Sequence, residues 1–503
     1  MAGYFLTMAL GIPFSGALLQ IFLPDHKKPF ALFRWIAFFS SFLASVIAIS
    51  CVAVMDRGVA SVQLSEVISW VGSYSISYDV GLDGLNVPII LLISIVFPLL
   101  IIFEWNRDRG PKGIYGLLLI LQACFFGVGF SQDLFLGFFF WTLSVFPLYF
   151  LLAIWGGAER EKAAFRFLIT ASIGNALFFL GLLLVYFSIE PHTFSFKELL
   201  GGRVTGTFVL FGSEYSLSLT AFFLIISGLV FRFPVWPIHG WLTFLATQAP
   251  ASIFVLFTGI LPAVGLYLLA KTSFSLFPVE FAGWSRLVLF FGALNVLFGA
   301  VISLAQRELR LLLAYLTLAH CGMILIGFAS LDSAGVTGSM FQLLVVGLSL
   351  SGLGLFVGSV RLRKGHSAYL TPEGDPVFGG WIGTAPLLTF IAGLLMASVL
   401  GVPGLGGFVG QSLTVMGGYT VSPLAVIVLM VGLLIMTLSL FNVFRGVFLG
   451  SGRAQKQWVS DLSAREKLIL FPIVGVLLMI GLVPKPFLDL MRPSVLTLLS
   501  IMK

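Results

Sequence analysis

Charged residues are scarce in this sequence: Asp, Glu, Lys and Arg make up 10% of the 503 residues, whereas hydrophobic residues make up 59%. A soluble domain carries about 25% charged residues, so a water-soluble chain of this length is excluded. Cysteine is also scarce, with 3 copies. Cys51, Cys124 and Cys321 stand singly in apolar stretches without ligand spacing or a disulfide pattern, which predicts small buried side chains and no metal site.

The formal net charge is +7, but the basic residues stand singly in loops between apolar runs. A nucleic-acid partner is therefore not expected, and the positive-inside rule of membrane proteins accounts better for the charge. The first apolar run has no basic segment before it, so we expect a retained span rather than a cleaved signal.

Apolar stretches of membrane-spanning length recur along the whole chain. They predict an all-α polytopic membrane protein with about fourteen transmembrane helices, because roughly twenty apolar residues cross the hydrocarbon core as a helix. The predicted spans are 2–23, 33–54, 86–103, 114–131, 134–156, 165–187, 216–236, 251–270, 286–305, 311–329, 338–360, 385–415, 423–445 and 467–484.

The loops between these stretches are short, so we expect one membrane domain over 1–503. The longest loops, 55–85 and 188–215, fall on one face and have room for short strands or hairpins. The tail 485–503 contains Pro486 and Pro493 and is expected to lie at the membrane interface.

Lysine and arginine alternate between rich and poor loops, which predicts the orientation. The rich set, expected in the cytoplasm, contains Lys27, Lys28, Arg34, Arg107, Arg109, Lys112, Arg160, Lys162, Arg166, Arg307, Arg310, Arg361, Arg363, Lys364, Arg445, Arg453, Lys456, Arg465 and Lys467. The poor set contains Arg57, Lys197, Arg203, Lys271, Arg286, Lys485, Arg492 and Lys503. An even number of spans then places both termini on the outer side of a bacterial cytoplasmic (inner) membrane.

Two predicted spans are interrupted, near 232–240 and near 400–408. Pro234 and Pro237 interrupt the first, and Pro403 with Gly404 interrupts the second. Proline removes a helix hydrogen bond, so each break is either a packing kink or a functional discontinuity. Breaks in corresponding places of two half-chains favour an inverted-repeat transporter fold, with repeats over 114–270 and 286–445.

The first break carries a resemblance to a known family. The run Phe233-Pro234-Val235-Trp236-Pro237-Ile238-His239-Gly240-Trp241-Leu242, followed by Ala249-Pro250, resembles the signature of the proton-translocating antiporter-like subunits. These subunits occur in respiratory complex I (NADH-quinone oxidoreductase), in multisubunit cation/proton antiporters and in membrane-bound hydrogenases.

Further segments resemble the family in the same order along nearly the whole chain. They are Leu82-Asp83-Gly84-Leu85-Asn86, Phe140-Trp141, Pro147-Leu148-Tyr149-Phe150, Trp155-Gly156-Gly157, Leu312-Leu313-Ala314-Tyr315, Ala319-His320-Cys321-Gly322, and Pro403-Gly404 with Gly407-Phe408-Val409-Gly410. The short C-terminus is similar to the M-type subunit. The resemblance implies proton translocation coupled to electron transport, with other membrane subunits as partners. No flavin, iron-sulfur or nucleotide motif is present, so no cofactor is expected here, and NADH and quinone would be met only through partner subunits.

The titratable residues that the resemblance implies are missing. Thr142 stands where the family places a glutamate, Arg232 and Ala263 where it places lysines, and Gln411 where it places lysine or glutamate. The usual Pro-Asp-Ala-His run is replaced by Thr243-Phe244-Leu245-Ala246. Threonine and glutamine exchange no proton at physiological pH, and arginine keeps its own. We therefore expect an impaired proton path.

Two titratable or charged candidates remain within the spans, His320 and Arg232. His320 lies within a span, and two roles remain possible for it. It could relay protons, because its unperturbed pKa suits proton exchange, or it could be a hydrogen-bonded histidine of the core. Arg232 is expected to have a structural or electrostatic role with a partner at the helix break. His239 is expected near a membrane face.

The remaining charges in and around the spans read as solvated. Asp83, Glu104 and Asp133 lie at span ends and are expected to be solvated helix caps, and Glu159-Arg160-Glu161-Lys162 reads as a solvated cytoplasmic turn.

Two alternatives to a complex I subunit stay open. A cation/proton antiporter or hydrogenase subunit shares the same motifs. A stand-alone secondary transporter would need a midplane substrate site made from polar side chains, for which the candidates are Arg232, Thr142, Ser144, Asn175 and Gln411.

Overall fold

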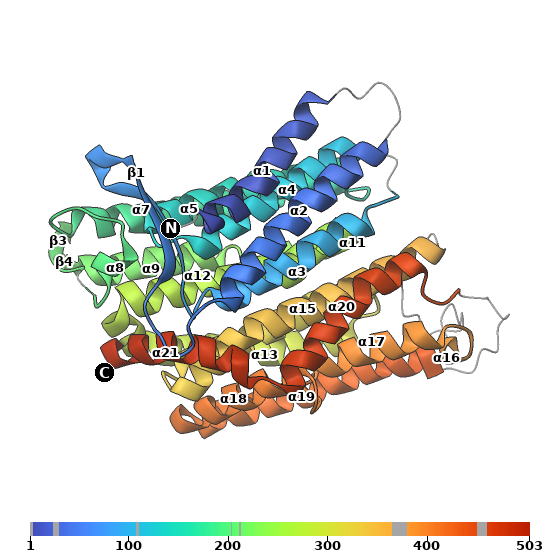
Figure 1. Cartoon of the computed structure of the whole chain (residues 1–503). Helices are drawn as coiled ribbons and strands as arrows, with labels where there is room; N and C mark the ends of the chain where they lie inside the picture. Colours follow the sequence, from blue (N-terminus) through green and yellow to red (C-terminus); the bar gives the residue numbers. More distant parts are fainter. Residues whose placement is uncertain are drawn as a thin grey trace.

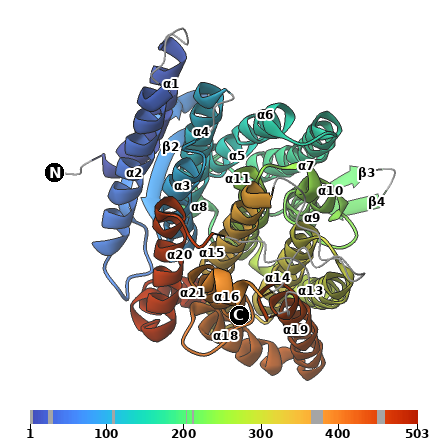
Figure 2. The same cartoon turned by 90° about the vertical axis from the view of Figure 1, so that its right-hand side faces the viewer.

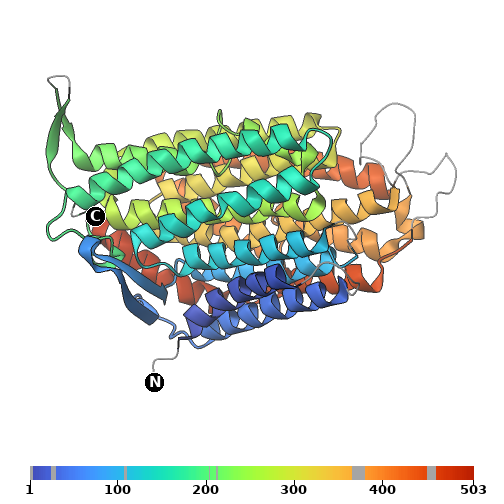
Figure 3. The ribbon, with the colours of Figure 1, turned by 90° about the horizontal axis from the view of Figure 1, so that it is seen from above.

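The computed structural model describes residues 4–23, 30–106, 110–202, 204–210, 213–364, 380–449 and 460–502. The helices run side by side in one bundle, and two small β-hairpins project from one end of it (Figures 1 and 3).

The elements of the first half follow the predicted apolar stretches. They are α1 (Phe5–Phe22), α2 (Phe30–Ala53), β1 (Gln63–Val71), β2 (Ile76–Leu82), α3 (Val87–Phe103), α4 (Pro111–Phe130), α5 (Leu134–Leu143), α6 (Val145–Trp155), α7 (Arg160–Phe187), α8 (Phe196–Leu199), β3 (Thr207–Leu210), β4 (Ser213–Ser216), α9 (Leu217–Val230), α10 (Gly240–Gln248), α11 (Ala251–Val255), a π-helical turn (Leu256–Ile260) and α12 (Leu261–Leu276).

The elements described in the second half are all helices. Its elements are α13 (Pro278–Ala305), α14 (Leu309–Ala329), α15 (Ser333–Lys364), α16 (Trp381–Thr384), α17 (Pro386–Val399), α18 (Gly406–Val421), α19 (Pro423–Phe444), a second π-helical turn (Arg445–Leu449), α20 (Ala464–Leu482) and α21 (Lys485–Met502).

Ten helices in the described ranges are long and apolar enough to cross a membrane, and the bent pair α20–α21 gives an eleventh candidate. The other three predicted stretches contain shorter apolar helices, α3, α9 and α17. The polytopic all-α fold is confirmed, and every predicted stretch contains a helix. The number of fourteen crossings itself stays a prediction.

The centre of the bundle consists of helices that other helices enclose. The membrane-length segments of α11–α12 and α15 are entirely buried, whereas those of α1, α13 and α19 are only one third buried. Viewed from the end opposite the hairpins, α15 and α11 lie centrally, with α1 and α2 on one flank (Figure 2).

Glycine allows neighbouring helices to approach closely. A Cβ atom added at Gly228 of α9 would lie 2.5 Å from the carbonyl oxygen of Gly174 in α7, and one at Gly322 of α14 would lie 2.5 Å from that of Gly292 in α13. Any larger residue would separate these backbones. In lipid, where packing rather than hydrophobicity holds helices together, small residues at such contacts are what association requires.

The two long loops contain the hairpins for which they had room. β1 pairs with β2 and β3 with β4, both antiparallel, and both hairpins stand at the same end of the bundle (Figure 3). Glu66 of β1 accepts hydrogen bonds from the backbone N–H groups of Leu6 (2.8 Å) and Thr7 (3.0 Å) at the start of α1. A carboxylate there satisfies free donors and complements the helix dipole, so it fixes the hairpin to the bundle.

The C-terminal segment is a helix, α21, bent by 71° from α20. Its buried side chains, including Met491, Val495 and Leu499, face the bundle. Ser494 accepts a hydrogen bond from the backbone of Gly84 at 3.0 Å. The placement of this segment at the membrane interface remains a prediction.

Candidate functional site at the broken helices

The first break is where the prolines predicted it. α9 ends at Val230 and α10 begins at Gly240. Asn295 of α13 satisfies the backbone between them: its Oδ1 accepts from Trp236 N at 2.7 Å, and its Nδ2 donates to Pro234 O at 3.3 Å. Asn295 lies inside an apolar helix, so the sequence analysis missed it. A lone buried amide in a membrane-spanning stretch was the available signal.

Arg232 lies in this break and is fully buried. Its Nη1 donates to the carbonyl oxygen of Trp141 at 2.5 Å and its Nη2 to Ser144 Oγ at 2.7 Å, and its guanidinium lies 3.6 Å from the centroid of the Trp141 ring. The expected partners therefore exist, and they are a carbonyl, a hydroxyl and an aromatic face. Among the described residues, no carboxylate lies within 4 Å of this guanidinium.

Thr142 and Ala263 lie near the break but form no site with Arg232. The Thr142 hydroxyl, next to Trp141 on α5, has no hydrogen-bond partner in the described structure. Ala263 is buried in α12 and supplies only a methyl group. A Cβ atom added at Gly265 of α12 would lie 3.0 Å from Phe233, so the break is level with this part of α12.

The second break contains Gln411. α17 ends at Val399 and α18 begins at Gly406, with Gly401 and Gly404 in left-handed conformations (φ +73° and +92°). Gln411 Nε2 donates to the carbonyl oxygen of Val399 at 2.8 Å. A Cβ atom at Gly401 would lie 2.0 Å from Gln411 Oε1, so glycine is required beside this amide. The neutral side chain thus satisfies a carbonyl that the break releases.

The rings of His320 and His239 take no part in the hydrogen bonds described at the two breaks, although His239 is the last residue of the first break. His320 is fully buried in α14, and neither ring nitrogen has a hydrogen-bond partner among the described residues. His239 is the residue before α10, with its ring 5.1 Å from that of Phe298. No hydrogen bond in the described structure joins Arg232, His320 and Gln411.

A buried ion pair contradicts the expected positions of Lys271 and Asp83. Lys271 was assigned to an outer loop, but it lies within α12 and is 3% exposed, and Asp83, expected to be solvated, is 8% exposed. Lys271 Nζ lies 3.4 Å from Asp83 Oδ2, 2.8 Å from Ser131 O and 3.1 Å from Gln132 Oε1. The prediction failed because α12 continues to Leu276, beyond the expected end of the span at 270.

Lys271 does not replace the titratable residues that are missing around Arg232. It lies six residues beyond Gly265, about 9 Å along the helix. The described contacts connect it to the β2–α3 and α4–α5 corners rather than to Arg232.

Glu104 and Asp133 were also wrongly expected to be solvated. Asp133 is fully buried and caps α5 by accepting from the backbone of Leu136 at 2.9 Å. Glu104 is 3% exposed and accepts a hydrogen bond from Ser252. Hydropathy marks both as ends of spans, but neighbouring helices cover them. The turn at Lys162 and Glu159 is exposed as expected, with an ion pair of 2.9 Å.

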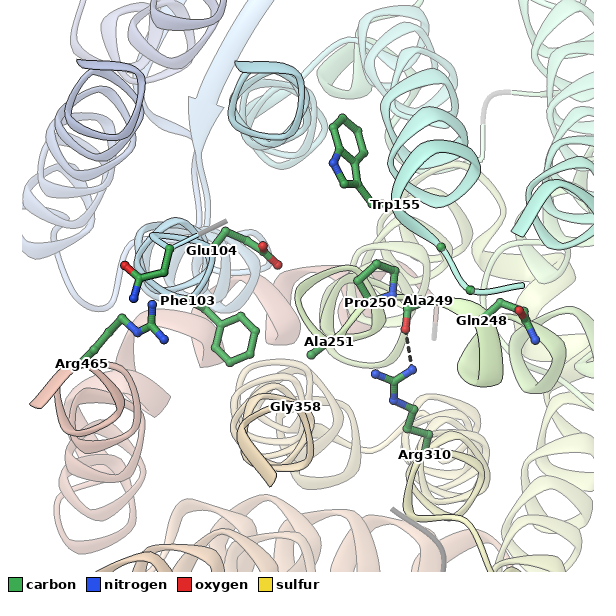
Figure 4. Close-up of a pocket in the computed structure, with 13 residues that line it drawn as sticks. Phe103, Glu104, Trp155, Gln248, Ala249, Pro250, Ala251, Arg310, Gly358 and Arg465 are labelled. Carbon is green, nitrogen blue, oxygen red and sulfur yellow. Dashed lines mark hydrogen bonds between the residues drawn. The ribbon is translucent and has the colours of Figure 1, made fainter. Parts of the chain in front are cut away.

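Glu104 lines a cavity of about 570 Å³ (Figure 4). The side chains of Trp155, Gln248, Arg310 and Arg465 also line it. Arg310 Nη1 donates to the carbonyl oxygen of Ala249 at 2.6 Å. The cavity lining therefore includes apolar side chains together with a carboxylate and two guanidinium groups, but none of the predicted site residues.

Discontinuous helices inside a many-helix bundle, with polar groups at the breaks, are typical of the membrane-transporter class of folds. The family described as "NADH:quinone oxidoreductase/Mrp antiporter, TM" matches residues 131–437. The chain belongs to this family, and the resemblance drawn from the motifs is confirmed.

The chain is similar to curated proteins over most of its length. It is 30% identical over 447 residues to the F(420)H(2) dehydrogenase subunit M of Methanosarcina mazei, covering 87% of each chain. It is 27% identical over 471 residues to the NADH-quinone oxidoreductase subunit M of Rhodobacter capsulatus, covering 92% of this chain and 89% of that one.

Two solved structures share the fold. One is a chain of respiratory complex I from Thermus thermophilus with bound NADH (TM-score 0.85, 23% identity, 99% of this chain and 100% of that chain). The other is a chain of the Mrp complex from Dietzia sp. DQ12-45-1b (TM-score 0.84, 18% identity, 99% and 97%).

Proposed function

We propose that this chain is a membrane subunit of an NADH-quinone oxidoreductase-like respiratory complex and that its own proton path is interrupted. The names of the relatives support the complex, and the fold supports an antiporter-like subunit. Redox chemistry would take place in partner subunits, and this chain would contribute no redox centre or catalytic residue.

One observation is the main support for an interrupted proton path. Arg232 stands where the family pattern has a lysine, and its partners are a carbonyl, a hydroxyl and an aromatic ring. A group that keeps its proton and has no acid beside it cannot pass a proton onward. Thr142, Ala263 and Gln411 supply no titratable group, and Lys271 is engaged elsewhere.

The two breaks support the proposed repeats, 114–270 and 286–445. α9 is the fourth apolar span counted from α4, and α17–α18 is the fourth counted from α13. Corresponding breaks are typical of inverted repeats. In this arrangement the subunit would act as a scaffold between pumping neighbours in a bacterial inner membrane, with both termini on the outer side.

The test measures protons moved per electron pair by the reconstituted complex. The variant combines Thr142→Glu, Arg232→Lys and Ala263→Lys. We expect it to move more protons per NADH than the wild type, because three groups that exchange protons return to the midplane. The matched control, Thr142→Gln with Arg232→Met and Ala263→Met, adds bulk without titration and is expected to give no gain. A wild-type stoichiometry equal to that of a fully charged homologue would refute the interruption.

A subunit of a cation/proton antiporter complex is the second candidate, because the fold of an Mrp chain matches as well as that of a complex I chain. Identification of the subunits that copurify with the chain separates the two. Redox subunits would favour the respiratory complex, and further antiporter subunits alone would favour the second candidate. A stand-alone transporter is expected to purify without partners and to move a solute by itself.

A further inference from the structure

Polar atoms of α5 and of the α5–α6 corner face the first break in the interior of this bundle. Trp141 O and Ser144 Oγ are joined by a hydrogen bond of 2.7 Å and each also accepts from Arg232, whereas the Thr142 hydroxyl beside them has no partner in the described structure. Polar atoms of this kind recruit water when space is available, and a file of water conducts protons. A subunit that no longer pumps therefore still needs a barrier against passive leakage.

We propose that Arg232 is that barrier: an electrostatic plug that excludes water and repels protons and other cations at the first break. The inference rests on the proposed loss of pumping, and it adds a task that the remaining positive charge performs. No substrate or partner is required for this task.

The geometry of the contacts that Arg232 makes supports the role of a plug. The side chain is fully buried, two of its nitrogens are hydrogen-bonded to α5 and the α5–α6 corner, and its flat face covers the Trp141 ring at 3.6 Å. The guanidinium thereby uses acceptor positions on Trp141 O and Ser144 Oγ to which water would otherwise bind. Removal of the side chain would expose those atoms and leave room for water beside them.

The charge of Arg232 fits a plug as well. Arginine keeps its proton at physiological pH, so the barrier is permanent, whereas a buried lysine can release its proton. No carboxylate in the described ranges lies within 4 Å of the guanidinium. Lys271 differs, because Asp83 lies 3.4 Å from its amine. A fixed positive charge without a counter-ion is the arrangement by which some pores exclude protons and cations.

The test is passive flux through the purified, reconstituted complex under an imposed pH gradient, without NADH. The probe vesicles are phosphatidylcholine liposomes with an internal pH dye, and chloride flux is measured in parallel. In Arg232→Met the charge is lost and the apolar stem remains. We expect the proton leak to rise on the order of tenfold, since a nearby unit charge sets the barrier to a cation, and chloride flux to stay at the wild-type level.

A second variant separates the loss of the charge from misfolding. In Arg232→Gln an amide can still donate to Trp141 O or Ser144 Oγ, so it keeps part of the packing and loses the charge. The matched control, Arg166→Met, removes an exposed arginine from α7 and is expected to leave both fluxes unchanged. Intact assembly is checked by size-exclusion chromatography.

Each outcome decides the proposal. A selective rise in proton leak in either neutral variant supports the plug. An unchanged proton leak in assembled variants refutes it, and so does an equal rise in proton and chloride flux, which assigns Arg232 a packing role only. The proposed loss of pumping fails separately, through NADH-driven stoichiometry, because the leak is measured without turnover.

Discussion

At the scale of single residues, the polar side chains at the two breaks bond mainly to backbone groups rather than to opposite charges. Asn295 and Gln411 each bond to backbone groups that a broken helix releases, and Arg232, which lies in the first break, bonds to the carbonyl oxygen of Trp141 in α5. A freed backbone group in lipid costs several kcal/mol unless a partner is found. These side chains therefore stabilise the breaks.

The pair of Lys271 and Asp83 is expected to be important for stability. Lys271→Met would leave the buried Asp83 carboxylate without its cation, at a cost of about 3–5 kcal/mol. We expect a lower melting temperature of the detergent-solubilised protein. Lys271→Met with Asp83→Asn should recover part of the loss, because the uncompensated charge is gone.

The control for this pair is Lys162→Met, whose ion pair with Glu159 lies at the surface. Exposed pairs contribute about 0–1 kcal/mol, so the melting temperature should hardly change. If Lys271→Met melted at the same temperature as Lys162→Met, the buried pair would have no structural role.

Asn295 is expected to stabilise the backbone of the first break. Asn295→Ala leaves Trp236 N and Pro234 O without partners, which costs about 1–3 kcal/mol for each group. Asn295→Asp keeps an acceptor for Trp236 N and should lose less. Thermal unfolding measures the loss, with Ser285→Ala on the same helix as control, since Ser285 bonds only to the preceding turn. Equal melting temperatures for both alanine variants would contradict this role.

At the scale of elements, α5 begins at a buried acidic cap. Burial raises the pKa of Asp133 from 3.8 to about 6, against the opposing effect of its hydrogen bonds to Leu136 and Ser77. The folded state therefore binds the proton more tightly than the unfolded state. The stability from this proton is fully present below about pH 4 and is lost as the pH rises through 6.

The predicted consequence is a pH-dependent melting temperature. Asp133→Asn should flatten the decline between about pH 4 and 6, because the amide keeps an acceptor and does not titrate. The exposed Asp56 supplies the control, Asp56→Asn. The difference between variant and wild type is the quantity to follow, since burial also raises the pKa of Asp79. An unchanged slope in Asp133→Asn would overturn the assignment.

Much of the element pattern could be predicted from the sequence, because local chemistry determines it. Apolar runs located the helices, two prolines located the break after Val230, and Pro403 with Gly404 located the break after Val399. The charge partners could not be predicted. Lys271 and Asp83 are far apart in sequence, and hydropathy shows where a span ends but not which neighbours cover its end.

The candidate site was predictable only in part. The missing titratable residues are visible in the sequence once the family pattern is recognised. The roles of their replacements depend on tertiary contacts: Gln411 bonds to a carbonyl twelve residues earlier, and Arg232 bonds to a different helix. Asn295 is not part of a recognised family motif, and its role is visible only in the contact of α13 with the break.

At the scale of the whole molecule, the bundle combines an enclosed centre with a lipid-facing shell. The membrane-length segments of α11–α12 and α15 are entirely buried, whereas only one third of the residues in those of α13 and α19 are buried. Both hairpins and the C-terminal helix lie at one end (Figure 1). That end is the one predicted to face outward, where the loops contain few basic residues.

The enclosure of α12 by α15 makes the two halves of the chain interdependent during biogenesis. α15 belongs to the second half, yet it contacts α3, α11 and α12 of the first. Until the ribosome has delivered it, the Lys271 helix has an open flank that only lipid or an assembly factor can cover. We therefore expect that neither half folds by itself, and that two fragments divided between α13 and α14 have to be expressed together in order to assemble in the membrane.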